Sequence, residues 1–185
     1  TTSGFASNTI SRAGDYVVWY AKRVRSIKYH TLYKEKVFGG DGSDKYRKIE
    51  LSDGTRMNIS DWEKQNGAVF DYKNRPYGSR LYQLDNLTSQ GGANQPQPYT
   101  FEDKIYTPSS SLHWKANYPE GMKRLEANKR ISAEGNTLRY VRYFDDFNYM
   151  MLSNMWGDIG GIQDRSDGKI YVVQTANKVI QRCML

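Results

Sequence analysis

The sequence has very few of the side chains that usually build metal sites or disulfides. Among its 185 residues there is one cysteine, Cys183, and there are two histidines, His30 and His113. A single cysteine excludes a disulfide framework within these residues and a zinc site made of several cysteines. Two histidines make a multi-histidine metal centre implausible. The low cysteine content is typical of proteins from a reducing compartment.

Long apolar runs are also missing. No stretch of the chain is long and apolar enough to cross a membrane, and no signal peptide is recognisable. Apolar residues make up 38% of the chain, which is low but still compatible with one sizeable domain that has its own core.

Aromatic and basic residues are abundant instead. Aromatic side chains account for 14% of the residues, and the net charge is +7. Between Arg12 and Lys48 there are ten lysines and arginines against four acidic residues, whereas the remainder has seventeen against sixteen. Within this stretch, Tyr29 and Tyr33 alternate with basic residues, a pattern suited to phosphate neutralisation and base stacking. An ordinary solvated basic face is the alternative. The candidates for phosphate contacts are Lys22, Arg23, Arg25 and Lys28.

Short strand-like pieces and turn signals predict an α+β fold of mixed or antiparallel strands and hairpins with a few short helices. Hairpins are expected at Lys45–Ser60, around Asp53-Gly54, and at Tyr99–Pro108. The continuous apolar run Asp15–Lys22 predicts a strand that is buried on both faces. Further strands are expected at 137–144 and 169–173, helices at 60–63, 117–131 and from 177 onward, a short helix or turn at 75–84, and a long loop at 85–98.

Asp145 and Asp146 form an acidic pair directly after a predicted strand. Paired carboxylates bind Mg²⁺ in nucleases, so a metal-dependent nuclease is one candidate function. Carboxylates that are merely solvated or ion-paired are the alternative.

Arg139 and Arg142 lie three positions apart on the predicted strand 137–144, and they should therefore point to opposite faces. One of them is expected to face DNA while the other pairs with an acid such as Asp145. Arginine suits the guanine edge and glutamine the adenine edge, although each such residue can equally be an ordinary surface side chain. The candidates for base reading are Arg75, Arg80, Gln90, Arg139 and Arg142.

Five longer segments resemble the adenine-specific DNA methyltransferases of type III restriction-modification systems. They are GFASNTISRAGDYVVWYAK (4–22), LTSQG (87–91), HWKANYPEGMKRLEANKRI (113–131), GNTLRYVRYFDDF (135–147) and WGDIGGIQDRSDGKIYVVQTANKVIQRCML (156–185). The resemblance covers most of the chain and is looser between about Gly39 and Arg80.

The resemblance implies methyl transfer from S-adenosylmethionine to N6 of adenine in double-stranded DNA. In that family a D/N-P-P-Y/F/W tetrapeptide is catalytic, and none is present here because no two of the five prolines are adjacent. A segment similar to T-Q-K-P precedes the family's cofactor loop, and Gln174, Thr175 and Lys178 match it loosely as cofactor contacts. Thr1 at the start and the apolar Met184 and Leu185 at the end favour a portion of a longer enzyme.

On this interpretation the chain has three parts. Residues 1–25 supply a strand of the catalytic sheet, 26–168 form the target-recognition region, and 169–185 form a strand and a helix leading toward the cofactor loop. The expected partners are double-stranded DNA, the remaining catalytic parts of the same enzyme, a restriction subunit and a second copy of the chain. The expected compartment is the cytoplasm of a prokaryote, and these residues alone are expected to be catalytically inactive. A basic protein-interaction domain that docks a restriction subunit is a further alternative.

Overall fold

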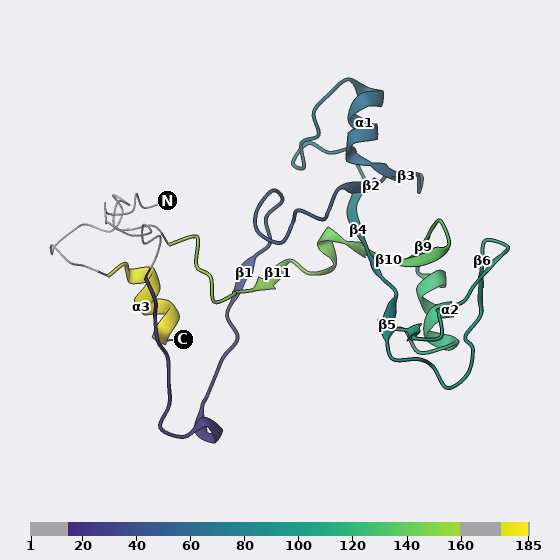
Figure 1. The fold of residues 1–185 in the computed structure, drawn as a ribbon. Coiled ribbons are helices and arrows are strands. Elements are labelled where there is room, and N and C mark those ends of the chain that lie inside the picture. Colours follow the sequence, from purple (N-terminus) through teal and green to yellow (C-terminus); the bar gives the residue numbers. More distant parts are fainter. Residues whose placement is uncertain (1–14, 160–174, 185) are drawn as a thin grey trace, which may run out of the picture. The chain divides into compact units, whose positions relative to one another are not determined.

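The computed structural model describes residues 15–159 and 175–184 (Figure 1). The protein has an α+β fold that consists mostly of antiparallel strands, as expected. The chain divides into two units, one formed by Lys36–Asn148 and the other by the residues before and after it. The strand expected at 169–173 and the candidate Gln174 lie outside the described residues.

A five-stranded antiparallel sheet organises the unit Lys36–Asn148. Its strand order is β3-β2-β4-β10-β9. The strands are β2 (Lys48–Glu50), β3 (Arg56–Asn58), β4 (Arg80–Asn86), β9 (Ile131–Glu134) and β10 (Thr137–Tyr143). The two longest strands, β4 and β10, are neighbours in the centre, where Tyr143 pairs with Tyr82 and Arg139 with Asn86.

Both predicted hairpins are confirmed. The turn between β2 and β3 is closed by the amide of Gly54, which donates to the carbonyl of Leu51 at 2.9 Å. Gly54 has a φ of +88°, a conformation that costs glycine little. The second hairpin pairs β6 (Tyr99–Phe101) with β7 (Lys104–Tyr106), and a separate two-stranded ladder pairs β5 (Thr88–Gln90) with β8 (Leu112–Trp114).

Helix α1 (Ile59–Asn66) forms where a helix was expected, but its start differs from the prediction. The N-cap position is Asn58, and its side-chain amide donates to Asp61 at 2.8 Å. Ser60 therefore lies inside the first turn and does not cap the helix. The start moves because Asn58 ends β3 in an extended conformation, so the chain enters the helix directly from the strand.

Helix α2 (Glu120–Ala127) confirms the central part of the helix predicted at 117–131. Met122 is fully buried, and Leu125 is partly buried against the same apolar cluster. Ile131, the last residue of the predicted helix, begins β9 instead. It still packs in the cluster with Met122, because the chain reverses after α2 and returns to the sheet.

Two apolar clusters pack against one face of this sheet, one near each helix, while Tyr82, Val141 and Tyr143 form a smaller cluster on the other face. The α1 cluster contains Tyr46, Ile49, Phe70, Leu81 and Phe144, and the α2 cluster contains Leu87, Tyr99, Tyr106, Trp114, Met122, Ile131 and Leu138. Register places Ile49 opposite Leu81, with Gln83 and Asp85 following at alternate positions of β4 on the same face. On β10, Arg142 is opposite Gln83, so polar side chains lie on this face between the two clusters.

Three other local predictions differ from the structure. Residues 15–22 form no strand, and their side chains are exposed, Tyr16 at 91%. A strand buried on both faces needs neighbouring strands that pair with it, and among the described residues no strand pairs with 15–22. The stretch 75–84 is a turn followed by β4. Several consecutive residues of β4 are buried, so the sequence lacks the alternation of apolar and polar residues that marks a half-exposed strand. The predicted loop 85–98 contains β5, so the irregular segment begins only after Gln90.

The other unit contains fewer regular elements. Strand β1 (Tyr33–Glu35) pairs with β11 (Tyr149–Met151), η1 is a short 3-10 helix (Val24–Ser26), and α3 (Asn177–Met184) begins where it was expected. In the described part of the chain, no helix has both the length and the apolar character needed to span a membrane.

Candidate nucleic-acid interface

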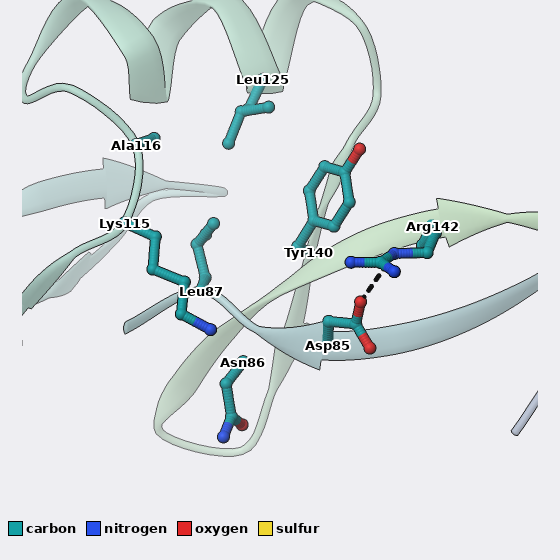
Figure 2. Close-up of a pocket in the computed structure, with 8 residues that line it drawn as sticks. All are labelled: Asp85, Asn86, Leu87, Lys115, Ala116, Leu125, Tyr140 and Arg142. Carbon is teal, nitrogen blue, oxygen red and sulfur yellow. Dashed lines mark ion pairs between the residues drawn. The ribbon is translucent and has the colours of Figure 1, made fainter. Parts of the chain in front are cut away.

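An open hollow of about 330 Å³ lies where β4 and β10 approach the α2 cluster (Figure 2). Its lining combines apolar side chains with hydrogen-bonding and charged ones. The residues are Asp85, Asn86, Leu87, Lys115, Ala116, Leu125, Tyr140 and Arg142. Tyr140 and Arg142 point to the same face because they are two positions apart on β10.

Arg142 is held at this hollow by Asp85. Its Nε donates to Oδ2 of Asp85 at 2.8 Å, while the buried Gln83 donates from Nε2 to Oδ1 of the same carboxylate at 2.7 Å. The Arg142 side chain is 43% exposed. Neither terminal nitrogen of its guanidinium has a partner within the described residues, so an oriented pair of donors is available to a ligand.

A second cation, Lys36, lies close to Arg142. Its ammonium sits 4.5 Å above the ring of Phe144 and 4.9 Å above that of Tyr46. Burial lowers the pKa of Lys36, Asp146 and Asp145 oppose that shift, and the positive charge of Arg142 adds to it. Two cations thus share the polar region between the apolar clusters.

Arg75 extends the row of cations beyond Lys36. Its guanidinium lies 4.4 Å from the ring of Tyr72, which packs against Phe144 at 5.3 Å, and Lys36 covers Phe144. At the other end, Lys115 lines the hollow with Arg142. We call these four residues, Arg75, Lys36, Arg142 and Lys115, the basic strip. Only Arg142 among them forms an ion pair with a carboxylate in the described part of the chain.

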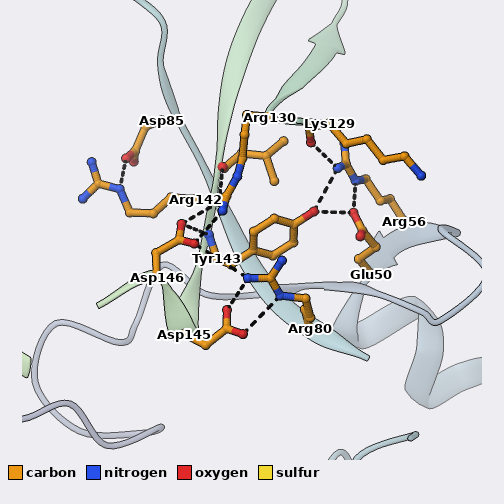
Figure 3. A network of polar contacts seen from close by, with 11 residues as sticks. Glu50, Arg56, Arg80, Asp85, Lys129, Arg130, Arg142, Tyr143, Asp145 and Asp146 are labelled. Carbon is orange, nitrogen blue, oxygen red and sulfur yellow. Dashed lines mark hydrogen bonds and ion pairs between the residues drawn. The ribbon is translucent and has the colours of Figure 1, made fainter. Parts of the chain in front are cut away.

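Arg80 has a different role from the other base-reading candidates. It lies on the opposite face of the sheet, where it donates from Nε and Nη2 to Asp145 at 3.1 and 2.8 Å (Figure 3). Its guanidinium also covers the ring of Tyr143 at 3.6 Å. Because these donors are already used, Arg80 is better suited to holding the sheet than to reading a base. The acid expected to pair with Arg139 or Arg142 therefore pairs with Arg80 instead.

The remaining part of this network surrounds Tyr143 and Asp146 (Figure 3). The hydroxyl of Tyr143 donates to Glu50 at 2.7 Å and accepts from Arg56 at 3.1 Å. Burial, followed by the hydrogen bond to Glu50, raises the pKa of Tyr143. Arg130 binds both oxygens of Asp146, at 2.6 and 2.8 Å.

Asp145 and Asp146 are thus both occupied by arginines. Burial acts to raise the pKa of Asp146, but hydrogen bonds from Arg130 and from the Tyr143 amide outweigh it, and the pKa is lowered. In the part of the chain that the structure describes, no group of three or more His, Cys, Asp or Glu side chains could hold a metal ion. The geometry therefore gives no support to the nuclease alternative.

Arg139 and Gln90 occupy two further positions. Arg139 bonds the side-chain oxygen of Asn86 and lies on the face opposite Arg142, as their spacing predicted. Gln90 is exposed at the end of β5.

The phosphate candidates belong to the other unit. Lys22, Arg23, Arg25 and Lys28 lie in and beside η1, and all four are exposed without an ion pair to any described residue. Of the weak cofactor candidates, Thr175 is exposed before α3, and Lys178 pairs with Asp158 at 2.7 Å. Since Asp158 also binds Arg182, Lys178 serves to fix α3 and is a poorer cofactor contact.

Sequence reasoning missed Lys36, Asp85, Asn86 and Lys115 as parts of this surface. No local signal marks them, since they become neighbours only through the pairing of β4 with β10 and the packing of the loops. Comparisons with protein-family models, with curated proteins and with solved structures gave no match. Function is therefore inferred from this chain's own residues.

Proposed function

We propose that this chain is the DNA-binding, target-recognition portion of a site-specific adenine-N6 DNA methyltransferase. S-adenosylmethionine is the methyl donor of the full-length enzyme in this proposal. The observation that carries the DNA-recognition part is the geometry of Arg142. The Asp85 carboxylate accepts a hydrogen bond from Nε of Arg142, and the two terminal nitrogens of the guanidinium remain available as donors. They lie at the edge of the hollow, and Arg142 itself is part of the basic strip.

This arrangement matches the requirements of base reading. Guanine presents O6 and N7 side by side in the major groove, and a planar guanidinium can donate to both. Asp85 fixes the guanidinium plane in advance, so less side-chain freedom is lost on binding. Tyr140 beside it adds a hydrogen-bonding group for a neighbouring base.

The other cations suit the sequence-independent part of DNA binding. Phosphate contacts position a protein on the duplex, while contacts to base edges select the site. Arg75, Lys36 and Lys115 supply such charges in one unit, and the exposed cations Lys22–Lys28 supply them in the other. Lysine and arginine side chains without a carboxylate partner can replace the counterions around the phosphates.

The methyltransferase part of the proposal rests on the sequence resemblance. Chemistry at adenine N6 requires the base to leave the stack and enter a catalytic pocket. In the resembling family a D/N-P-P-Y/F/W tetrapeptide grips that base, and the tetrapeptide is not among these residues. The proposal assigns them the positioning and reading of DNA, and it assigns the methyl transfer to the other parts of the enzyme.

Binding to duplex DNA at several salt concentrations tests the proposal. The affinity should fall as salt rises, with a slope of log affinity against log salt of roughly −0.9 for each phosphate contacted. Binding that is absent even at low salt would contradict the proposal and favour a protein-docking domain. Mg²⁺-dependent cleavage of the same duplex would favour the nuclease alternative.

Selection of bound duplexes from a random library tests the reading of sequence. The wild-type protein should enrich a site with a guanine at one or more fixed positions. At one of these positions, Arg142→Ala should no longer prefer guanine. An equal drop in affinity for every sequence would mean that Arg142 contacts only phosphate.

A further inference from the structure

Tyr77 is the most exposed large apolar side chain in the described part of the unit Lys36–Asn148, at 99%. It stands in a tight turn from Pro76 to Ser79, in which the Ser79 amide donates to the Pro76 carbonyl at 3.0 Å. Gly78 occupies the third position with a φ of +71°, as in a type II turn. The turn thus presents the ring of Tyr77 to solvent.

Several contacts fix this turn in place. The hydroxyl of the buried Ser79 also donates to the Pro76 carbonyl, at 2.6 Å. Arg75 donates to the carbonyls of Tyr72 and Ser79 at 2.9 and 3.4 Å, which ties both ends of the segment together. Gly78 lies against Ser52, since a Cβ built on it would be 3.1 Å from the Ser52 Cβ. The ring of Tyr77 is consequently held on a rigid support while it contacts nothing itself.

The charges around the turn favour an anionic partner. Arg75 ends the basic strip two residues before Tyr77, and its Nη2 has no partner among the described residues. Lys73 is exposed nearby, close to Asp71. The neighbouring acid Asp71 is turned toward its own loop, where it accepts from the Lys73 amide at 2.9 Å and from Asn74 at 2.6 Å.

We infer that Tyr77 stacks on an unpaired nucleobase at the Arg75 end of the basic strip. Aromatic rings beside cations bind unstacked bases in this way, because every base has a π face and every nucleotide carries a phosphate. The inference rests on the proposed DNA binding and adds a contact for a base that has left the duplex stack. A protein partner fits less well, since Arg75 beside the ring donates only to backbone carbonyls and has no carboxylate partner in the described part of the chain.

The test compares a fully paired duplex with the same duplex carrying one unpaired base. Tyr77→Ala should weaken binding to the second DNA by roughly 5- to 150-fold, the range expected for the loss of one base stack. Tyr77→Phe should bind like the wild type, because stacking needs only the ring. The substitution Phe147→Ala, which removes another exposed aromatic side chain of this unit, is the matched control.

A fluorescence measurement gives an independent readout. In Tyr77→Trp the emission added to that of the four native tryptophans should be quenched when the DNA with the unpaired base is added, and less so with the paired duplex, with the wild type as reference. The inference would be overturned if Tyr77→Ala bound both DNAs with normal affinity, or if DNA left the emission added in Tyr77→Trp unchanged. In either case, binding by the wild-type protein would still uphold the proposed function. If the wild-type protein binds neither DNA, the proposed function itself fails and the inference falls with it.

Discussion

Arg130 and Asp146 form a two-point ion pair in which both terminal nitrogens of the guanidinium reach the two carboxylate oxygens, at 2.6 and 2.8 Å. Asp146 follows β10, and Arg130 directly precedes β9, so the pair ties the two strands together at that end. The Asp146 side chain is only 12% exposed, and the backbone amide of Tyr143 also donates to its carboxylate. The contact therefore stabilises the sheet that carries Arg142.

Replacing Arg130 should destabilise this unit clearly. Arg130→Ala leaves Asp146 mostly buried without its main partner, which we expect to lower the free energy of unfolding by about 2–3 kcal/mol. Urea unfolding followed by tryptophan fluorescence measures the change. Lys123→Ala is the control, because it breaks the exposed pair with Glu120 and should cost less than about 0.5 kcal/mol. Equal effects of the two variants would contradict this account.

The same carboxylate predicts a pH dependence. The pKa of Asp146 is lowered in the folded protein, so ionised Asp146 stabilises the fold above its unfolded pKa of about 3.9. That contribution is lost as the pH falls through the folded pKa. The stability difference between the wild type and Asp146→Asn should therefore be large at pH 7 and shrink below about pH 4. A difference that stays constant from pH 7 to pH 2.5 would exclude this role.

Arg142→Lys separates charge from geometry at the hollow. The lysine keeps the positive charge but has no planar pair of donors and no Nε to bond Asp85. We expect the preference for guanine at one position to fall by about tenfold or more, while the salt dependence of binding stays nearly the same. Library selection and salt titration of the same variant measure the two effects. If Arg142→Lys keeps the same base preference as the wild type, Arg142 does not read a base.

The exposed cations near η1 predict a change in salt dependence. Neutralising Arg23 and Arg25 together to glutamine should make the slope of log affinity against log salt shallower by up to about 1.8, if each contacts one phosphate. The double variant Lys64→Gln, Lys123→Gln removes the same charge from two lysines that pair with Asp61 and Glu120. That control should leave the slope nearly unchanged. Identical slopes for both variants would indicate a general charge effect.

Local patterns were sufficient for the elements that depend mainly on their own residues. The hairpin at Asp53-Gly54 formed because the turn residues select it, and α2 formed around Met122 and Leu125, which share one face. The opposite orientation of Arg139 and Arg142 followed from the two-residue period of a strand. The abundance of exposed cations between Lys22 and Lys28 was likewise visible in the composition.

Other features depended on which segments meet in space. Leu81, Tyr82 and Gln83 are buried together because β4 lies in the centre of the sheet, so the stretch showed no alternation and its strand was missed. The run at 15–22 is apolar enough for a buried strand, yet no strand of the described residues pairs with it and its side chains lie exposed.

For this protein, composition and short patterns established an excess of basic charge, the hairpins, the clearest helix and one strand with arginines on both faces. The partner of each arginine was decided by the fold. Arg142 meets Asp85, and Arg80 meets Asp145, because antiparallel register brings residues distant in the chain onto one face. That register is set by the simultaneous burial of two apolar clusters, a collective property that no single segment contains.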